Sequence, residues 1–447
     1  MKESKQILIL GCGKTGESIL SHLLQQNKNI TLYDDNIENA INLANKFKNI
    51  NILEKIEDLK KLDIEFAAIS PSIRTIFNPH KIVLKLQEMN IKIISDFDLM
   101  YQNINKNIKL IGLTGTNGKS TTTALLDFVL KELGKNSISC GNIGTPVLDC
   151  NFENIEYVCI EASSYQLEIS SVSFYAGILL NITQDHLEHH GEMSEYIKQK
   201  INIFKHNKVS IISNEDEHCK KILNENGNYN QISCSEILKV GFSFYENNFY
   251  KNNEKLNFNI QDLQILGKHN MQNILAVLSF CFFENFDLQS TFDAICKFKP
   301  LPHRMEIVRK IGNITFVNDS KATNPNSVKC ALSCFNEVYL IAGGVSKYPK
   351  SILEISQYYS KIKHFLLIGK AAAEFNNDLP IKNKRTMYAN MKNAVIDAYN
   401  KAKLDIKKDQ SLNPVILLSP LCASFDMYEN FEKRGDDFKN IVKNYIN

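Results

Sequence analysis

The sequence lacks paired cysteines, a strong net charge and long apolar runs. Its eleven cysteines are scattered singly with no C-x-x-C pair, which argues against a disulfide framework, and we find no clustered zinc ligands. The formal net charge of +3 gives no basis for a nucleic-acid or membrane partner. The apolar run "ILIL" behind "MKESK" is too short for a signal peptide or a membrane span, and no other stretch approaches a spanning length. We therefore expect a soluble, cytoplasmic protein with reduced thiols, and we expect it to be a monomer.

Strand-like and helical patterns alternate along the chain. At about 150 residues per domain, the length predicts roughly three domains, and the alternation predicts parallel, doubly wound α/β sheets. Pro300 and Pro302, in "KFKPLPHRME", predict an extended linker. The strand candidates are "QILIL", "ITLYDD", "EFAAISPS" and "IKIISD", then "IKLIGL", "YVCIEASS", "AGILLNIT" and "VSIISN", and finally "ITFVND", "VYLIAGG", "HFLLIG" and "PVILLSP".

The first glycine-rich loop is "GCGKTG", from Gly11 to Gly16, between a predicted strand and a predicted helix. Asp34 ends the next strand, where an acid that binds a ribose is expected. Glycines let backbone N–H groups approach a diphosphate at a helix N-terminus. NAD, FAD or a UDP-sugar would all satisfy this pattern, and so would a tight turn without a ligand.

The second glycine-rich loop, "GLTGTNGKST", spans residues 112–121. Lys119 followed by Ser120 and Thr121 is typical of a phosphate-binding loop, in which the lysine contacts terminal phosphates and a hydroxyl group binds Mg²⁺. The usual first glycine of that motif is replaced by Leu113, and the glycines fall at 112, 115 and 118. We expect their backbone N–H groups to form an anion-binding nest for ATP.

Several stretches resemble the Mur ligase family and the related folylpolyglutamate synthases, and the resemblance covers nearly the whole chain. "TGTNGKST" is similar to the ATP loop of these enzymes. The segments that follow agree in order: "GNIGTP" (141–146), "EASSYQLE" (161–168), "NITQDHLEHHG" (181–191), "GKHNMQN" (267–273) and "PHRME" (302–306). The C-terminal stretches resemble the branch of the family that adds D-glutamate: "NDSKATNPNS" (318–327), "IAGGVSK" (341–347) and "LLSPLCASFDMYENFEKRGDDF" (417–438).

The resemblance implies three domains with separate ligands. It implies a Rossmann-like UDP-sugar-binding domain at 1–106, a P-loop ATPase-like domain at 107–300 and a Rossmann-like amino-acid-binding domain at 301–447. The implied reaction joins D-glutamate to UDP-N-acetylmuramoyl-L-alanine through an acyl phosphate, with ATP and two Mg²⁺ ions, in peptidoglycan synthesis. The alternatives are a sister ligase for another amino acid, a folylpolyglutamate synthase-like ligase, an oxidoreductase using the first loop, and a nucleotide sensor.

The reaction implied by the resemblance needs many cations, because a carboxylate must attack an anionic phosphate. The residues implied for catalysis are Lys119, Asn142, His186, Lys200, Arg304 and Lys321. Those implied for ATP are Gly115, Thr116, Asn117, Gly118, Lys119, Ser120, Thr121, Thr122, Asn270, Asn273, Arg304 and Asp319. Those implied for Mg²⁺ are Ser120, Thr121, Glu161, His186 and Lys200, with Lys200 carried as a carbamate and Lys198 as its neighbour in sequence.

The outer domains carry the other implied contacts, with some departures from the family pattern. Those for the UDP-sugar are Gly13, Lys14, Thr15, Asp34, Asp35 and Ser70, and those for D-glutamate are Thr323, Lys347, Ser424 and Phe431. Ser72 replaces an expected glycine, and Asn36 stands where an arginine often meets uracil. Val345 and Ser346 replace residues that are commonly Asp and Gly.

Overall fold

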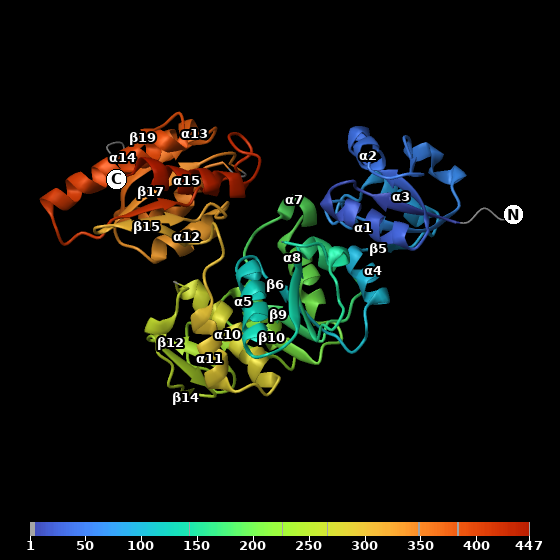
Figure 1. Ribbon diagram of the computed structural model, residues 1–447, viewed down its shortest axis with the longest axis horizontal. Helices are drawn as coiled ribbons and strands as arrows, with labels where there is room; N and C mark the ends of the chain where they lie inside the picture. Colours follow the sequence, from blue (N-terminus) through green and yellow to red (C-terminus); the bar gives the residue numbers. More distant parts are fainter. Residues whose placement is uncertain are drawn as a thin grey trace. The chain divides into compact units, whose positions relative to one another are not determined.

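The computed structural model contains three sheets distributed over two compact units. It describes residues 5–142, 144–225, 227–265, 267–346, 349–381 and 384–446, with the backbone alone for residues 268 and 269. The first unit runs through residue 262 and adds residues 271–296, whereas the second comprises residues 263–270 and the chain from residue 297 onward. Each unit is described separately below (Figure 1).

The first sheet has five parallel strands in the order β3-β2-β1-β4-β5 and is blue in Figure 1. Leu8 and Ile9 of the central strand are completely buried and face opposite cores. The strands are β1 Gln6–Leu10, β2 Asn29–Tyr33, β3 Asn51–Ile52, β4 Ile64–Ile69 and β5 Ile93–Ile94. The helices are α1 Lys14–Gln25, α2 Ile37–Ala44, α3 Lys81–Glu88 and α4 Asp96–Asn103, with a 3₁₀ helix at Ile56–Lys61.

The second sheet has nine strands in the order β14-β13-β12-β11-β10-β9-β6-β8-β7. The strands are β6 Lys109–Thr114, β7 Ser137–Gly141, β8 Tyr157–Glu161, β9 Ala176–Leu179, β10 Val209–Ser213, β11 Asn230–Ser233, β12 Phe242–Tyr245, β13 Asn248–Lys251 and β14 Glu254–Lys255. The helices are α5 Lys119–Glu132, α6 Ser164–Ile169, α7 Leu187–His190, α8 Met193–Ile201, α9 Glu217–Asn224, α10 Lys268–Phe283 and α11 Leu288–Lys297, with 3₁₀ helices at Val147–Asp149, Asn202–Phe204 and Ile260–Asp262.

Strands β7 to β12 are parallel, whereas β13 and β14 add an antiparallel meander that the sequence analysis did not predict. Two-residue turns make the reversals. Glu246 and Asn247 have φ values of 46° and 61°, and Asn252 and Asn253 have φ values of 48° and 69°. Two consecutive positive φ values define the tight hairpin turn that matches strand twist, and asparagine tolerates this conformation.

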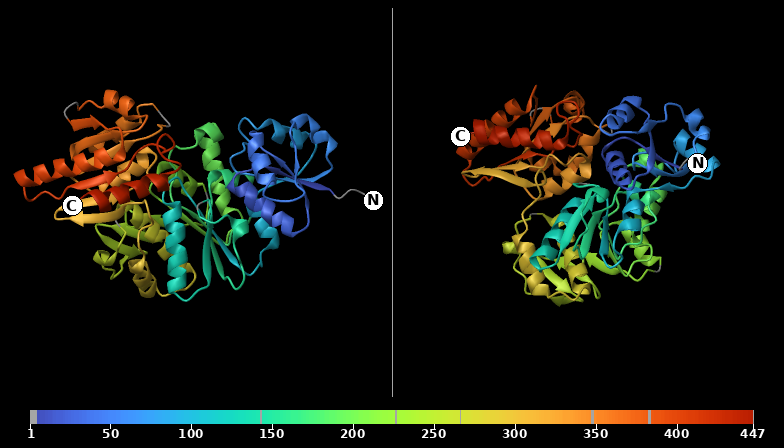
Figure 2. Two further views of the ribbon diagram at one scale, coloured as in Figure 1. Left: turned by 45° about the horizontal axis from the view of Figure 1, so that its top comes forward. Right: turned by 45° about the vertical axis from the view of Figure 1, so that its right-hand side comes forward.

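The third sheet has six strands in the order β15-β16-β20-β17-β18-β19, all parallel except for β15 against β16. Figure 2 shows this part, coloured orange to red, from two further directions. The strands are β15 Glu306–Ile311, β16 Ile314–Asn318, β17 Val338–Gly343, β18 Ile362–Ile368, β19 Arg385–Met387 and β20 Val415–Leu418. The helices are α12 Pro325–Ser333, α13 Ala372–Asp378, α14 Met391–Lys408 and α15 Phe431–Tyr445, with a 3₁₀ helix at Ser351–Lys361.

Both faces of the third sheet are buried. Leu340 of β17 lies in one core, together with Val328 of α12. Tyr339 lies in the opposite core, together with Val395 of α14 and Phe438 of α15. Helices on both faces of a mainly parallel sheet confirm the predicted α/β class.

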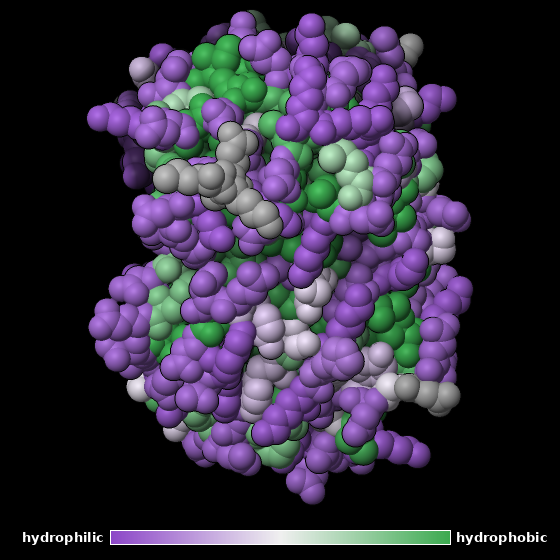
Figure 3. Space-filling model, turned by 90° about the vertical axis from the view of Figure 1, so that its right-hand side faces the viewer, coloured by the Kyte–Doolittle hydropathy of each residue, from purple (hydrophilic) through white to green (hydrophobic). Residues whose placement is uncertain are grey.

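One face of the molecule is drawn in Figure 3 with its side chains coloured by hydropathy. In Figure 3, hydrophilic side chains dominate the drawn face and hydrophobic ones lie among them. Within the described ranges, no helix combines the length and apolar character that crossing a membrane requires.

Candidate active site

The second glycine-rich loop lies between β6 and α5, as predicted. Gly118 is the N-cap of α5 with φ of 87°, and no side chain caps this helix. The first backbone N–H groups of a helix have no partner within the helix, so an uncapped N-terminus attracts anions. Gly112 differs from the prediction, because it belongs to β6, where a Cβ atom would lie 2.5 Å from Ile203. It permits close packing and does not contribute to the loop.

Asn181 braces the loop from the end of β9. Its Oδ1 accepts a hydrogen bond from the backbone N–H of Asn117 at 2.8 Å, and its Nδ2 donates to the carbonyl of Asn117 at 3.1 Å. Its carbonyl accepts from the N–H of Thr116 at 2.9 Å. Sequence reasoning missed this residue, although its position directly after a buried strand beside the loop strand was a usable signal.

Two lysines converge on the same carbonyl oxygen of the loop. Lys119 Nζ donates to the Gly115 carbonyl at 2.8 Å, and Lys200 Nζ donates to the same oxygen at 2.9 Å. Lys200 is only 1% exposed. Its burial, followed by the nearby charge of Lys119, lowers the pKa of Lys200 well below its usual range. Both effects act in favour of the neutral form of the Lys200 amine.

A buried carboxylate lies at the same edge of the sheet. Glu161 ends β8, next to β6, and is 2% exposed. Asn142 follows β7 and donates from its side chain to Glu161 Oε1 at 3.0 Å, while its backbone N–H donates to the Glu161 carbonyl. Parallel strands bring these carboxyl ends together, which explains why residues distant in sequence meet. Ser120 opens α5 and is also buried.

His186 is the N-cap of α7, with a φ of 55°. Its Nδ1 lies 2.8 Å from the hydroxyl of Tyr165, and its Nε2 lies 3.5 Å from Asp185. These partners fix the orientation of the imidazole ring, so His186 is positioned by α6 as well as by its own loop.

The remaining predicted nucleotide contacts lie on several elements. Asn273 of α10 approaches the loop, because a Cβ atom at Gly118 would lie 2.6 Å from Asn273 Oδ1. Asn270, one turn earlier in the same helix, is also buried. Thr122 donates its hydroxyl to the Gly118 carbonyl at 3.0 Å, whereas Thr121 is half-buried.

The first glycine-rich loop is a tight turn with an open outer side. A Cβ at Gly16 would lie 1.9 Å from the Gly11 carbonyl, so the turn requires glycine there. A Cβ at Gly13 would meet nothing within 4 Å. Ser70 donates to the Gly11 carbonyl at 3.1 Å. Asp34 accepts from the backbone N–H of Cys12 at 2.8 Å and thereby holds the loop.

The other predicted UDP-sugar residues surround this loop. Asp35 Oδ1 lies 3.0 Å from His80 Nε2. Asn36 caps α2 by accepting from the N–H of Glu38, which gives a structural role to this departure from the family pattern. Lys14 Nζ donates to the Gly144 carbonyl at 2.6 Å. Thr15 is half-buried and Ser72 is exposed.

In the second unit, the loops after β16, β17 and β20 lie side by side, because these strands are neighbours. Lys321 Nζ lies 3.9 Å from the centroid of the Phe431 ring. Ser320 donates its hydroxyl to the Phe431 carbonyl at 2.8 Å. Thr323 is half-buried, and its N–H donates to the Lys321 carbonyl at 2.8 Å. Ser424 is 3% exposed in the loop that follows β20.

Asp319 lies at the end of β16. Its carboxylate accepts from Ser419 at 2.9 Å and from the N–H of Met305 at 3.2 Å. Burial raises its pKa to about 7, against the opposing effect of these hydrogen bonds and of Arg304. Arg304 follows His303, whose φ of 62° turns the predicted linker.

Lys347 lies outside the described residues. Val345 forms an isolated bridge with Ala423, with backbone hydrogen bonds of 2.9 and 3.1 Å in the two directions. Ser346 Oγ lies 3.2 Å from Ser351 Oγ. The Val345 bridge therefore joins the loop that follows β17 to the loop that carries Ser424.

Arg434 is a central residue of this unit that sequence reasoning missed. It is 1% exposed and donates to Ser320 Oγ at 3.0 Å, to the Ser320 carbonyl at 2.8 Å and to the Cys422 carbonyl at 3.0 Å. Burial lowers its pKa to about 10. A usable signal was its place on the apolar face of α15, four residues before Phe438.

Comparisons with known proteins agree with this architecture. A family model described as "Mur ligase middle domain" matches residues 113–281. A second, described as "Shikimate / quinate 5-dehydrogenase", matches residues 1–110, the region of the first sheet. The fold and the phosphate loop thus define a ligase of the Mur class.

The similar curated proteins identify the family within this class. UDP-N-acetylmuramoylalanine–D-glutamate ligase of Rickettsia prowazekii is 34% identical over 457 residues, with 99% of each chain covered. The ligase of the same name from Clostridioides difficile is 35% identical over 462 residues, again with 99% of each covered. The chain belongs to the UDP-N-acetylmuramoylalanine–D-glutamate ligase family, and the predicted family and enzyme class are confirmed.

Solved structures support the fold. The ligase MurC of Thermotoga maritima superposes with a TM-score of 0.60 at 17% identity, covering 99% of each chain. MurF of Acinetobacter baumannii superposes with a TM-score of 0.57 at 17% identity, covering 86% of this chain and 87% of that one.

Proposed function

We propose that this chain joins D-glutamate to the carboxylate of UDP-N-acetylmuramoyl-L-alanine, using ATP, in the synthesis of peptidoglycan precursors. The relatives at 34% and 35% identity carry this activity in their names. The observation that carries the proposal is the uncapped helix N-terminus at Gly118, with Lys119 and Lys200 both bound to the Gly115 carbonyl. Such an arrangement suits a terminal phosphate that must accept an incoming carboxylate.

The proposed first step forms an acyl phosphate. A carboxylate oxygen of the UDP-sugar substrate attacks the γ-phosphorus of ATP, the bond to the bridging oxygen breaks, and ADP leaves. Lys119 neutralises phosphate charge, while the backbone N–H groups at the start of α5 hold the phosphate oxygens. The side chain of Asn142, which also donates to Glu161, contacts the phosphates and the substrate carbonyl in this proposal.

The second step forms the amide. The neutral amine of D-glutamate attacks the acyl carbon, a tetrahedral intermediate forms, and phosphate leaves with the oxygen that came from the carboxylate. The amine gives up a proton to reach the amide. We assign Arg304 and Lys321 to the developing phosphoryl charge and Asp319 to the ribose of ATP.

Magnesium fits the residues at the edge of the second sheet. Glu161 is a buried carboxylate and Ser120 is a buried hydroxyl, and oxygen ligands of this kind suit Mg²⁺. We assign Ser120, Thr121 and Glu161 to one ion, and His186 with modified Lys200 to a second. Bound there, Mg²⁺ supplies positive charge that neutralises the phosphate oxygens.

Lys200 is the residue we assign to a carbamate. Its neutral nitrogen attacks carbon dioxide, a C–N bond forms, and a proton leaves to solvent, which yields an anion with two oxygen ligands. The lowered pKa of Lys200 supports this assignment, because only a neutral amine can attack. Lys198 is exposed and pairs with Glu195 at 3.4 Å, so it is the weaker candidate.

The outer regions complete the proposal. We assign the first sheet, within residues 1–106, to the UDP-sugar, with its diphosphate at the open side of Gly13. We assign the third sheet, within residues 301–447, to D-glutamate, whose carboxylates would meet Lys347, Thr323 and Ser424 beside Phe431. The central region, 107–300, then binds ATP. We further propose a monomer in the cytoplasm, where both the UDP-sugar and ATP are available.

A phosphate-release assay tests the function. Purified chain is supplied with ATP, Mg²⁺, UDP-N-acetylmuramoyl-L-alanine and single amino acids that include both glutamate enantiomers. Release is expected with D-glutamate and not with L-glutamate. Lys119→Ala should abolish it, whereas Lys131→Ala, an exposed lysine on the same helix, should not. Turnover with a different amino acid would replace the proposed substrate, and full activity of Lys119→Ala would remove the loop from the mechanism.

A further inference from the structure

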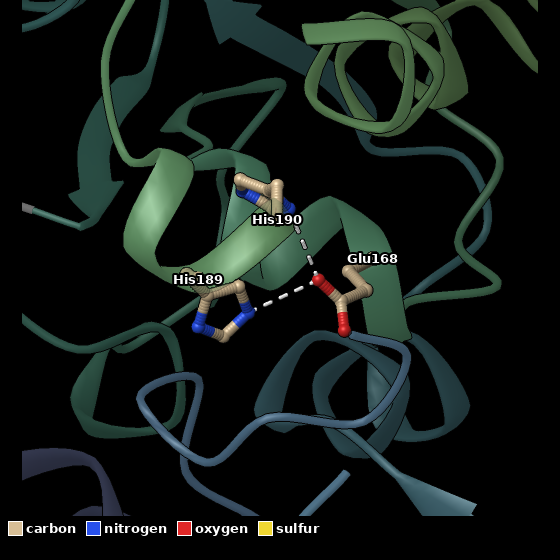
Figure 4. Close-up of side chains that lie close together, drawn as sticks. All are labelled: Glu168, His189 and His190. Carbon is tan, nitrogen blue, oxygen red and sulfur yellow. Dashed lines mark hydrogen bonds and ion pairs between the residues drawn. The ribbon is translucent and has the colours of Figure 1, made fainter. Parts of the chain in front are cut away.

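A histidine–carboxylate cluster lies between α6 and α7, apart from the residues assigned to ATP. Glu168 Oε2 lies 3.1 Å from His189 Nε2 and 3.4 Å from His190 Nδ1 (Figure 4). One ligand atom from each residue lies within 4.8 Å of the others. The sequence analysis found no clustered zinc ligands, because residue 168 is separated by some twenty positions from the adjacent histidines. Only the packing of two short helices brings the three side chains together.

The cluster is buried and carries an ionised acid. The side chains of Glu168, His189 and His190 are 3%, 8% and 0% exposed. Burial by itself raises the pKa of Glu168, but the hydrogen bonds from His189 and Thr75 and the nearby ring of His190 outweigh it, so the pKa lies well below its usual range. A buried carboxylate must be balanced by a positive charge. That charge is either a proton on an imidazole ring or a metal ion.

One ring nitrogen of His190 faces the carboxylate of Glu168 without hydrogen bonding to it. Its Nε2 lies 2.9 Å from Ser164 Oγ, but its buried Nδ1 has no hydrogen-bond partner. Nδ1 nevertheless faces the Glu168 carboxylate (Figure 4). When Nε2 donates to Ser164 in the neutral ring, the lone pair of Nδ1 points toward an anion, which is repulsive. A cation bound between the two groups removes this repulsion.

We propose that Glu168, His189 and His190 form a binding site for a divalent transition metal of the zinc type. In a tetrahedral site with ligand bonds of about 2.0–2.1 Å, neighbouring ligand atoms lie about 3.3 Å apart. The two distances from Glu168 Oε2, 3.1 and 3.4 Å, match this spacing. Two imidazoles with one carboxylate suit zinc, cobalt or iron, whereas Mg²⁺ and Ca²⁺ prefer oxygen ligands. Water fills the fourth position.

The surroundings provide the supporting contacts that metal sites need. The hydroxyl of Thr75 donates to Glu168 Oε1, which leaves Oε2 for the metal. Ser164 orients the ring of His190 through Nε2. Such outer partners fix the tautomer of a histidine and the orientation of a carboxylate ligand. Thr75 belongs to the region of the first sheet, so a metal here would also order that loop against α6.

A metal bound at this site would position a neighbouring residue, His186. The ring of Tyr165, on α6, packs at a tilt against His189 with ring centroids 4.1 Å apart, and its hydroxyl lies 2.8 Å from His186 Nδ1. A metal that ties α6 to α7 therefore holds the ring of His186 in place without touching the substrate. The proposal does not depend on the proposed reaction, since metal binding is measured without substrate.

Cobalt substitution tests the site. The full chain is treated with a chelator and then titrated with Co²⁺ in saturating Mg²⁺, which occupies the oxygen-ligand sites. A tetrahedral site gives strong visible d–d absorption, whereas octahedral Co²⁺ absorbs weakly. We expect one strongly absorbing Co²⁺ per chain, with absorption lost in Glu168→Gln and His190→Gln. His218→Gln, a half-buried histidine on α9, is the matched control and should retain it.

A second measurement covers variants that fail to fold. Stoichiometric Zn²⁺ should raise the thermal midpoint of the unaltered, chelator-treated chain by several degrees, and an equal amount of Mg²⁺ should not. Absence of tetrahedral absorption in the unaltered chain, its persistence in both cluster variants, or a midpoint unmoved by Zn²⁺ would each overturn the proposal. The cluster would then be an ion pair that carries its proton on histidine. Loss of phosphate release with the cobalt spectrum intact would instead count against the proposed function alone.

Discussion

The substitution Gly118→Ala probes the phosphate loop at the position where α5 begins. Gly118 has φ of 87°, a left-handed conformation that an L-residue adopts at a cost of about 1–2 kcal/mol. The added Cβ would also lie 2.6 Å from Asn273 Oδ1 and 3.1 Å from Leu180 Cδ1. Either the Asn273 side chain or the loop backbone must therefore move, and both are assigned to ATP.

The expected effect on ATP binding exceeds the effect on folding. Misplacing one charge-assisted hydrogen bond to a phosphate costs about 1.5–3 kcal/mol, which corresponds to about a 10- to 100-fold weaker affinity. Gly134→Ala is the matched control, because Gly134 has φ of 77° but nothing within 4 Å of its Cβ position. Gly134 lies just beyond the far end of the same helix, so its substitution introduces the strain without the collision.

Isothermal titration with a non-hydrolysable ATP analogue, together with thermal midpoints, checks this prediction. Both variants should lose similar stability from the backbone strain, but only Gly118→Ala should lose ATP affinity. Equal affinities in the unaltered chain and in Gly118→Ala would refute the assignment of this loop to the triphosphate. Equal losses in the two variants would show that strain alone explains the effect.

Three further predictions address the buried charged groups. Lys200→Ala should lower turnover by at least about 100-fold, as expected when a charged group that stabilises the transition state is lost. Added short-chain carboxylic acids should restore part of the turnover, and a complete lack of rescue would count against the carbamate. The pKa of Asp319, raised to about 7 by burial, makes its neutral form favourable in the folded state, so stability is complete below about pH 4 and declines as the pH rises toward 7. In chemical denaturation measured across that pH range, Asp319→Asn should reduce this loss of unfolding free energy by at most about 4 kcal/mol. An unchanged dependence of the unfolding free energy on pH would contradict the assignment. Arg434→Met removes three hydrogen bonds and should lower the unfolding free energy by about 3 kcal/mol. The same substitution should raise the KM for D-glutamate more than the KM for ATP, and equal shifts of the two KM values would leave Arg434 with a structural role alone.

Much of the fold could be predicted because its signals are local. Apolar runs such as that of β6, followed by glycines and a helical pattern, identified the strand, the loop and the helix in order. The hairpin at Glu246 and Asn247 escaped because it depends on two consecutive positive φ values. Glutamate at the first of these positions is not a usual signal for such a turn, so the pattern could not be recognised in advance.

Candidate site residues can be named from the sequence where they belong to a motif, but contacts that arise only from packing cannot. Lys119 follows directly from the loop sequence, and Glu161 follows from the family resemblance. The meeting of Lys119 with Lys200 at one carbonyl depends on the crossover that places α8 beside the loop. Asn181 and Arg434 act through hydrogen bonds to backbone groups, and such contacts leave no motif in a single sequence.

The central claim is that a carboxylate oxygen of the UDP-sugar substrate attacks ATP. Labelling both carboxylate oxygens of UDP-N-acetylmuramoyl-L-alanine with ¹⁸O tests this most directly. If an acyl phosphate forms, each turnover with D-glutamate releases inorganic phosphate that contains one ¹⁸O atom, and mass spectrometry detects it. Inorganic phosphate that contains no ¹⁸O, released while the amide forms, would contradict the mechanism.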